Sequence, residues 1–443
     1  MLDYSSFRLA LPNPLLTASL HPSEPILATG LSSGHVQVYR LPSEASTTAA
    51  ADSDSDHDSD DDTSPSPESQ NSSEFSLLWK TRRHKPTVRA VSYTCDGRSL
   101  LSAGTDTLFK VADSSTGKVS SKYAIPTSAT NQKKRAGDPS KAVPDAAVPT
   151  VIDASINAHT ALMGTEAGTI LRLDLRTPKG FVEGQVWSLD PAEGAYGADT
   201  VSSIVPLPGL EGGEPRQIVA TGGVVLAVFD IRKPGKTIVT SEMQEDDILC
   251  ATWVPYWPGR TGVGNSRGRI LTGMAEGMAG VWRRGEWEDH GDRINVCKKD
   301  GDSVDSIIGI DGLGIVAGTG GGKVKVFKVG GNKVLGELTH STEEEGGEGV
   351  GFVGEDTEGR LVSAGGECVR VWYKNNRKDK APKGSDDEDD SDADSDDSDA
   401  SEDESDIDSE EEHARRKRKR KGLGARKGPK PAKNVKMTFE GLD

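Results

Sequence analysis

A short hairpin pattern that recurs along the chain sets the strongest limit on how this sequence can fold. Each copy has an apolar strand end, a turn containing Gly or another small residue, and a run of alternating apolar positions. Glycine supplies the positive φ that tight hairpin turns need, so the pattern indicates pairs of antiparallel strands. The copies close on the following residues: Tyr39, Ala112, Leu173, Phe229, Trp282, Phe327 and Trp372.

The spacing of the copies predicts how the hairpins assemble. The last three closing residues follow one another at intervals of 45 residues, and a four-stranded propeller blade repeats at about 40–45 residues. Earlier intervals are longer because two segments without a strand pattern, 42–74 and 126–148, interrupt the repeat. We therefore predict an all-β fold, a seven-bladed propeller over residues 1–374. The run FRLAL (7–11) is expected to pair as the outer strand of the last blade and so close the ring.

One copy of the hairpin, GIVAGTGGGKVKVF (314–327), also looks like a phosphate-binding loop. Such a loop needs Ser or Thr after its lysine and a helix behind it, whereas Lys323 is followed by Val324 and more alternating apolar positions. We interpret the stretch as a hairpin. GNSRG (264–268) places Ser266 like a hydrolase nucleophile, but it falls between predicted strands instead of on a strand-to-helix elbow. We therefore expect that the protein is not an enzyme. The alternative hypothesis is a cryptic hydrolase or nucleotide-binding enzyme.

The cysteines and the hydrophobic pattern limit the class of protein further. Cys95, Cys250, Cys297 and Cys368 are far apart and form no C-x-x-C pair. This argues against a zinc site and for reduced thiols in a cytosolic or nuclear compartment. The sequence has no run of about 18 apolar residues, and the residues MLDYSSFRLA lack the basic and apolar parts of a signal peptide, so we expect no secretory leader. We expect no cofactor, no metal, no small-molecule substrate and no membrane partner.

The second copy resembles a WD repeat nearly position by position. It reads RRHKPTVRAVSYTCDGRSLLSAGTDTLFKVAD (82–113), with His84 at the place of the Gly-His pair of the repeat. In WD repeats a His, a Ser, an Asp and a Trp are linked by hydrogen bonds. The resemblance assigns these roles to His84, Ser102 and Asp106, whereas Ala112 replaces the Trp and leaves the network incomplete. We expect a structural role for His84.

The order of parts along the chain is similar to that of one WD-repeat family. The features are HPSEPILATGLSSGHVQVYR (21–40), an H-x-x-x-V-R-A-V entry to the second copy, GTILRLDLR in the third, and a terminal MTFEGLD. Over roughly 1–374 and the last thirty residues the chain resembles the WD repeat-containing protein 55 family, particularly fungal nucleolar members. The resemblance implies a non-enzymatic nucleolar protein in ribosomal RNA maturation and large-subunit assembly. It would be a monomer that works with proteins of pre-ribosomal particles.

Residues 375–443 differ in composition from the rest of the chain. Residues 385–412 are mostly Asp, Glu and Ser, and such a segment buries too little apolar surface to offset the entropy of ordering. We therefore expect a disordered tail, whose basic part spans 415–436. The consecutive cations at its start are Arg415, Arg416, Lys417, Arg418, Lys419, Arg420 and Lys421.

These consecutive cations have three interpretations. They can be a nuclear or nucleolar address, an RNA-binding arm, or a merely solvated segment. We expect an address, which is compatible with RNA contact. Because the acidic run competes with phosphate for the same cations, that contact should be weak and sensitive to salt. The same tail would also suit a chromatin- or histone-binding propeller, which is the second functional alternative.

The stretch VPYWPGR (254–260) is a candidate docking site. It places Tyr256 and Trp257 in a turn bounded by Pro and Gly. Exposed aromatic side chains often contribute much of the binding energy of an interface, but the same residues can pack on their own blade. Both interpretations remain open at this point.

Overall fold

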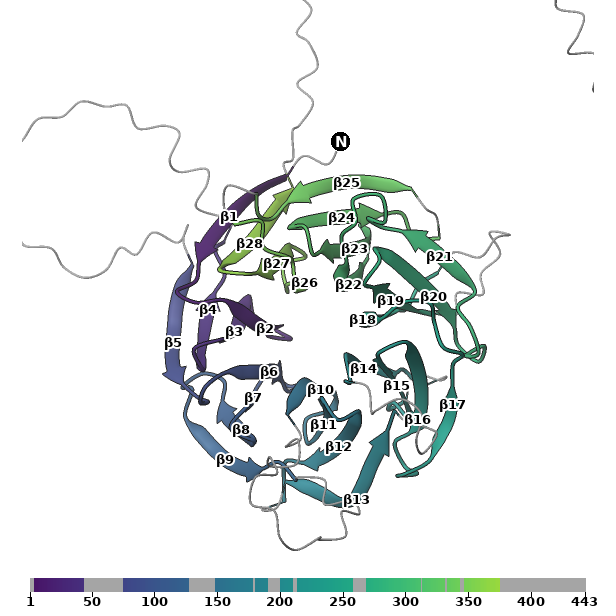
Figure 1. The fold of residues 1–443 in the computed structure, drawn as a ribbon. Helices are drawn as coiled ribbons and strands as arrows, with labels where there is room; N and C mark the ends of the chain where they lie inside the picture. Colours follow the sequence, from purple (N-terminus) through teal and green to yellow (C-terminus); the bar gives the residue numbers. More distant parts are fainter. Residues whose placement is uncertain are drawn as a thin grey trace, which may run out of the picture. The chain divides into compact units, whose positions relative to one another are not determined.

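The computed structural model confirms the seven-bladed propeller (Figure 1). It describes residues 4–43, 75–126, 148–177, 180–189, 200–209, 213–257, 268–311, 313–330, 333–342 and 346–374. Seven four-stranded antiparallel sheets follow one another around a ring. Within the described ranges, every regular element is a strand.

The first four blades each contain four strands in chain order, from the centre of the ring outward. Blade 1 comprises β2 (Leu15–Leu20), β3 (Ile26–Leu31), β4 (His35–Arg40) and β5 (Ser76–Arg82). Blade 2 comprises β6 (Val88–Tyr93), β7 (Ser99–Gly104), β8 (Leu108–Asp113) and β9 (Val119–Ala124). Blade 3 comprises β10 (Pro149–Asn157), β11 (Thr160–Thr165), β12 (Thr169–Asp174) and β13 (Phe181–Ser188). Blade 4 comprises β14 (Ser203–Leu207), β15 (Gln217–Gly222), β16 (Val225–Asp230) and β17 (Thr237–Thr240).

The last three blades complete the ring, and the final blade takes its outer strand from the N-terminal part of the chain. Blade 5 comprises β18 (Ile248–Val254), β19 (Arg269–Met274), β20 (Met278–Arg283) and β21 (Asp292–Asn295). Blade 6 comprises β22 (Val304–Ile310), β23 (Gly314–Thr319), β24 (Lys323–Phe327) and β25 (Val334–Thr339). Blade 7 comprises β26 (Phe352–Glu355), β27 (Leu361–Gly365), β28 (Cys368–Lys374) and β1 (Tyr4–Ala10).

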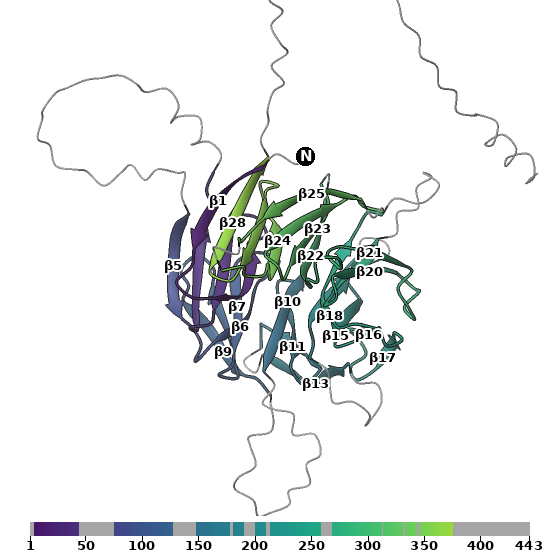
Figure 2. The ribbon, with the colours of Figure 1, turned by 45° about the horizontal axis from the view of Figure 1, so that its top comes forward.

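The ring closes through the pairing of β1 with β28. The two strands are antiparallel from Tyr4 opposite Lys374 to Ala10 opposite Cys368, and they run side by side in Figure 2. The ring of Phe7 meets that of Tyr373 edge-on, with centroids 5.1 Å apart. This pairing confirms the prediction that the N-terminal run completes the last blade.

Apolar side chains hold neighbouring blades together. The core consists of clusters that combine residues of adjacent blades, so each blade buries its faces against its neighbours. The residues that close the repeated hairpins are all buried, and Leu173, Phe229, Trp282 and Phe327 are 0% exposed. The sequence repeat therefore reflects one packing position in every blade.

The glycine-rich stretch 314–327 forms the hairpin β23–β24, as predicted. Gly322 in its turn has φ of 76°, a left-handed conformation that favours glycine. Its carbonyl oxygen accepts hydrogen bonds from the backbone N–H groups of His340 and Ser341, at 2.9 and 3.1 Å. The glycine thus serves a tight turn that anchors the next connection.

Connections between strands lie on two faces, because neighbouring strands are antiparallel. Face A carries the turns between the second and third strands of each blade and the connections from one blade to the next. Face B carries the turns between the first and second strands and between the third and fourth. Most of the two predicted insertions, residues 44–74 and 127–147, lies outside the described residues, as does all of 375–443.

Candidate docking sites on the propeller

His84 joins two parts of blade 2 through both nitrogens of its ring. It lies on face A between β5 and β6 and is 1% exposed. Its Nδ1 is 2.8 Å from Oδ1 of Asp106, and its Nε2 is 3.0 Å from Oγ of Ser102 on β7. These are the partners that the WD-repeat resemblance implies. Ala112, on β8, provides no indole to extend the network.

Two further blades contain parts of the same network, which sequence reasoning missed. In blade 7 the indole Nε1 of Trp372 donates to Oγ of Ser363 at 2.8 Å, and Nδ1 of His340 lies 2.8 Å from the same oxygen. In blade 5 the indole of Trp282 donates to Oγ1 of Thr272 at 3.0 Å. The available signals were a Trp at the close of the hairpin in both blades and, for blade 7, a His in the connection that precedes it.

The buried ring of His84 should make folding stability depend on pH. Burial lowers its pKa most strongly; Lys110 and Arg83 also lower it, whereas Asp106 raises it. The unfolded state, with a histidine pKa of about 6.5, therefore binds a proton more readily than the folded state. The contribution of neutral His84 to stability is therefore fully present above the unfolded pKa of about 6.5. It is lost as pH falls through that value toward the lower pKa of the folded state. His84→Gln should reduce the slope of unfolding free energy between pH 7.5 and 5.

Chemical denaturation at several pH values measures both slopes. Only the difference between the two proteins reports on His84, because His35 and His290, whose pKa values burial also lowers, contribute to both curves. Identical slopes for the variant and the unchanged protein would contradict the prediction.

Acidic side chains gather on face A between blades 4 and 7. The described connections there contain two lysines, Lys298 and Lys299, against a larger number of carboxylates. Some ion pairs form, such as Glu245 with Arg293 at 3.3 Å and Glu276 with Lys298 at 3.7 Å. The set, which we name the acidic arc, is Glu242, Glu245, Asp246, Asp247, Glu276, Asp300, Asp302, Glu348 and Glu367.

The acidic arc makes this part of face A suited to a basic partner. Its nine carboxylates outnumber the two lysines of the described connections, and the ion pairs of this region engage three of them, Glu245, Glu276 and Asp300, the last with Lys325 of β24. A surface of one charge sign attracts partners of the other sign and increases the rate of encounter.

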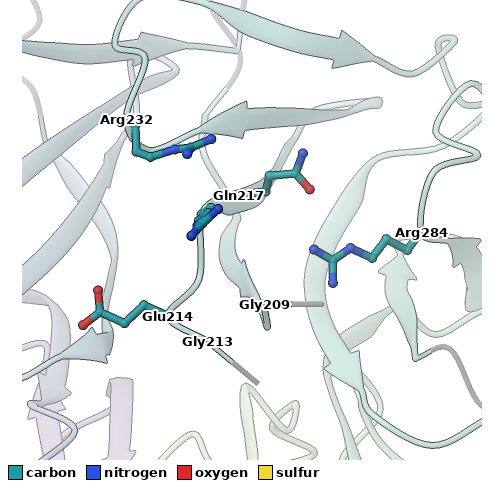
Figure 3. A pocket seen from close by; sticks show the side chains of 7 residues that line it. Gly209, Gly213, Glu214, Gln217, Arg232 and Arg284 are labelled. Atoms are coloured by element: carbon teal, nitrogen blue, oxygen red, sulfur yellow. The ribbon is translucent and has the colours of Figure 1, made fainter. Parts of the chain in front are cut away.

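Face B has a pocket of about 530 Å³ at the junction of blades 4 and 5. Figure 3 shows the side chains of Arg232 and Arg284 extending toward Gln217 from opposite sides, while that of Glu214 points away. We name it the arginine pocket. Its lining is Gly209, Gly213, Glu214, Arg216, Gln217, Arg232 and Arg284.

Protein groups hold two of these arginines in place. Arg232 forms a two-pronged ion pair with Asp230, in which Nε and Nη2 donate to the carboxylate at 2.9 and 2.7 Å. The hydrogen bond from Arg232 lowers the pKa of Asp230 to about 2, so this carboxyl is charged at neutral pH. Arg284 donates from Nη1 to the carbonyl oxygen of Pro208 at 2.6 Å, which connects blade 5 to blade 4.

The structure separates the two aromatic residues of the predicted docking turn. Tyr256 is 60% exposed on the turn that follows β18 on face B. Trp257 is partly buried and packs against a core cluster shared by blades 5 and 6. Trp257 thus has the packing role, whereas Tyr256 is free to meet a partner. Docking through Tyr256 remains a prediction.

Of the two residues that the enzyme alternatives rest on, the structure describes Lys323. Lys323 begins β24, and its Nζ lies 3.3 Å from Oε1 of Glu337 on the neighbouring strand. Ser266 lies outside the described residues, as do the cations from Arg415 to Lys421. Within the part of the chain that the structure describes, no group of His, Cys, Asp and Glu is arranged to hold a metal ion. The same part has no helix long and apolar enough to cross a membrane.

Comparison with known proteins gives the family. The chain is 37% identical over 382 residues to the WD repeat-containing protein jip5 of Botryotinia fuckeliana, covering 83% of this chain and 80% of that protein. The chain belongs to the family of the fungal WD repeat-containing proteins jip5. The relative from Aspergillus niger is 36% identical, with coverage of 83% and 80%. The one from Coccidioides immitis is 33% identical, with coverage of 86% and 83%. No family model matches the chain.

Membership in this family agrees with the propeller and with its WD-type hydrogen bonds. Propellers of WD repeats typically act as protein-docking scaffolds, and the names of the relatives state WD repeats without an activity. The protein is therefore a WD-repeat propeller scaffold.

Proposed function

We propose that the protein is a nucleolar scaffold in ribosome biogenesis, which docks proteins during ribosomal RNA processing and large-subunit assembly. The observation that carries this proposal is the acidic arc on face A, because it offers a rigid surface of negative charge to basic proteins. Ribosomal proteins are basic, as are other proteins that bind RNA. The resemblance to the WD repeat-containing protein 55 family supports the same role.

The basic stretch supplies the proposed address. Its seven consecutive cations form a block of the kind that import receptors and RNA phosphates bind. In this proposal the propeller docks partner proteins, and the seven cations direct the protein to the nucleolus. A weak, salt-sensitive contact with RNA would help to retain the protein where RNA is concentrated.

A chromatin or histone scaffold is a second candidate that the acidic arc also favours, since histones are basic as well. Copurification distinguishes the two. Sedimentation with pre-ribosomal particles supports the first proposal, whereas sedimentation with nucleosomes in the absence of those particles supports the second.

Truncation after residue 413 tests the proposed address. Residues 1–377 form a compact unit by themselves, so the truncated chain should fold and remain soluble. It should fail to accumulate in the nucleolus, because the seven cations are missing. Imaging of tagged full-length and truncated proteins measures this. A full-length protein with Gln at the same seven positions is the matched control and should behave like the truncation.

Nucleolar accumulation of both altered proteins would contradict the proposed address and place the signal in the propeller. Purification of the full-length protein, followed by mass spectrometry and sequencing of associated RNA, tests the scaffold role separately. Absence of pre-ribosomal proteins and ribosomal RNA precursors from the purified material would contradict that role.

A further inference from the structure

We propose that the arginine pocket on face B docks an acidic segment of a partner protein, through carboxylate or phosphorylated side chains. The pocket is on the face opposite to the acidic arc, so the two surfaces suit partners of opposite charge. This inference is independent of the nucleolar role, since it concerns binding chemistry that can be measured with purified protein.

Three separate segments bring cations to the pocket. Arg216 ends the β14–β15 turn, just before Gln217 begins β15; Arg232 follows β16, and Arg284 follows β20 of the next blade. The carbonyl oxygen of Arg216 accepts a hydrogen bond from the N–H of Ile231 at 3.0 Å, which holds the two turns of blade 4 together. The cations therefore belong to a preorganised site, and preorganisation reduces the entropic cost of binding.

The arginines have N–H donors beyond those that the protein itself uses. A guanidinium has five donors, of which Arg232 gives two to Asp230 and Arg284 gives one to Pro208. Burial lowers the pKa of Arg284, which indicates that its charge is partly removed from water. An anion in the pocket would compensate for that lost hydration. Planar guanidinium groups bind carboxylates and phosphates through pairs of hydrogen bonds.

The lining favours a protein segment over a nucleic acid. None of the lining residues that the structure describes is aromatic, whereas binding of single-stranded RNA relies on aromatic side chains that stack with bases. The cations also converge on one pocket instead of following a long groove. Gly213 leaves space beside its backbone, because a Cβ placed there would have no heavy atom within 4 Å. An extended peptide can approach such a backbone closely.

Binding of short acidic probes to the full-length protein tests the proposal. The probes are a fluorescein-labelled peptide of alternating Glu and Ser, the same peptide with phosphoserine, and an oligo-uridine of equal charge. Fluorescence anisotropy gives the affinities. Arg216→Gln, Arg232→Gln and Arg284→Gln should each weaken binding of an acidic peptide by about tenfold, as expected for loss of a charge-assisted hydrogen bond.

The chain offers a matched control in blade 3. Arg176 forms the same two-pronged ion pair with Asp174, at 2.9 and 2.8 Å, but does not line the pocket. Arg176→Gln removes the same kind of ion pair and the same charge, so it should leave peptide affinity unchanged. Contacts between the peptide and the basic stretch 415–436 are common to all variants and do not affect the comparison.

Hydrogen exchange locates the bound peptide. Saturating peptide should slow exchange in residues 213–217 of the unchanged protein, and Arg284→Gln should abolish this effect. Unchanged affinity in all three pocket variants, or equal weakening by Arg176→Gln, would overturn the proposal. Oligo-uridine binding that is tighter than peptide binding and is lost in the same variants would overturn it in favour of a nucleic-acid site. Weakening that differs between the two peptides identifies carboxylate or phosphate as the preferred group and supports the proposal.

Discussion

Replacing Arg360 with methionine is expected to lower the free energy of unfolding by about 3–5 kcal/mol, as for other buried ion pairs that lose one partner. The side chains of Arg360 and Asp356 are 5% and 0% exposed and form an ion pair. Nε of Arg360 donates to Oδ2 of Asp356 at 2.7 Å, and Nη1 donates to the hydroxyl oxygen of Tyr373 at 3.1 Å. Methionine fills much of the same space but leaves a buried carboxylate without its cation.

Arg360 also connects the end of the ring to its beginning. Its Nη1 donates to the carbonyl oxygen of Pro42, just after β4, and the hydroxyl of Tyr373 donates to the same oxygen at 2.9 Å. The guanidinium lies over the ring of Tyr373, 5.3 Å from its centroid. Its loss should therefore weaken the contact between blades 7 and 1 as well as the ion pair itself.

Chemical denaturation of the unchanged protein and of Arg360→Met measures the difference in their free energies of unfolding. Arg176→Met is the control, since its ion pair is exposed and such pairs contribute about 0–1 kcal/mol. The double variant Asp356→Leu, Arg360→Met removes both charges and should recover part of the lost stability. Equal effects of Arg360→Met and Arg176→Met would show that the buried pair is not important for stability.

The sequence was sufficient to predict the fold because the fold depends on short-range patterns. Alternating apolar positions and a glycine turn specify a hairpin within about fourteen residues, as GIVAGTGGGKVKVF does for β23 and β24. The interval of 45 residues then gives the blade. Closure by the N-terminal run also followed, since an unpaired outer edge of a sheet is unfavourable.

The functional surfaces could not be predicted in the same way, because they combine residues from distant parts of the chain. Arg284 reaches the carbonyl of Pro208, and Arg360 reaches that of Pro42; neither pair has a local signal. The acidic arc likewise collects residues from several connections that are adjacent only on face A. The roles of Tyr256 and Trp257 depend on which of the two side chains packs inward, and neighbouring residues in a turn give no periodicity from which to decide.

Deletion of residues 1–12 should have the largest effect of all on stability, although it removes nothing from the repeated part of the sequence. The deletion removes β1 and its pairing with β28, from Tyr4 opposite Lys374 to Ala10 opposite Cys368. It also removes Leu11, which is 5% exposed and whose N–H donates to the carbonyl oxygen of Glu367 at 2.8 Å. Each lost hydrogen bond costs about 0.5–1.5 kcal/mol, and buried apolar surface is lost in addition.

The total loss in free energy of unfolding should exceed about 5 kcal/mol, which is comparable with the whole stability of many domains. Thermal unfolding measures it, and deletion of residues 1–3, which precede β1, is the control. A synthetic peptide of residues 1–12 should raise stability with the logarithm of its concentration once it exceeds the dissociation constant, because a ligand that binds only the folded state stabilises it by mass action. Without the peptide, β28 presents an open edge, so the shortened protein should also associate with itself. An unchanged melting temperature would mean that the ring does not depend on β1 for closure, and the stability of blade 7 would then have to come from its contacts with blades 6 and 1.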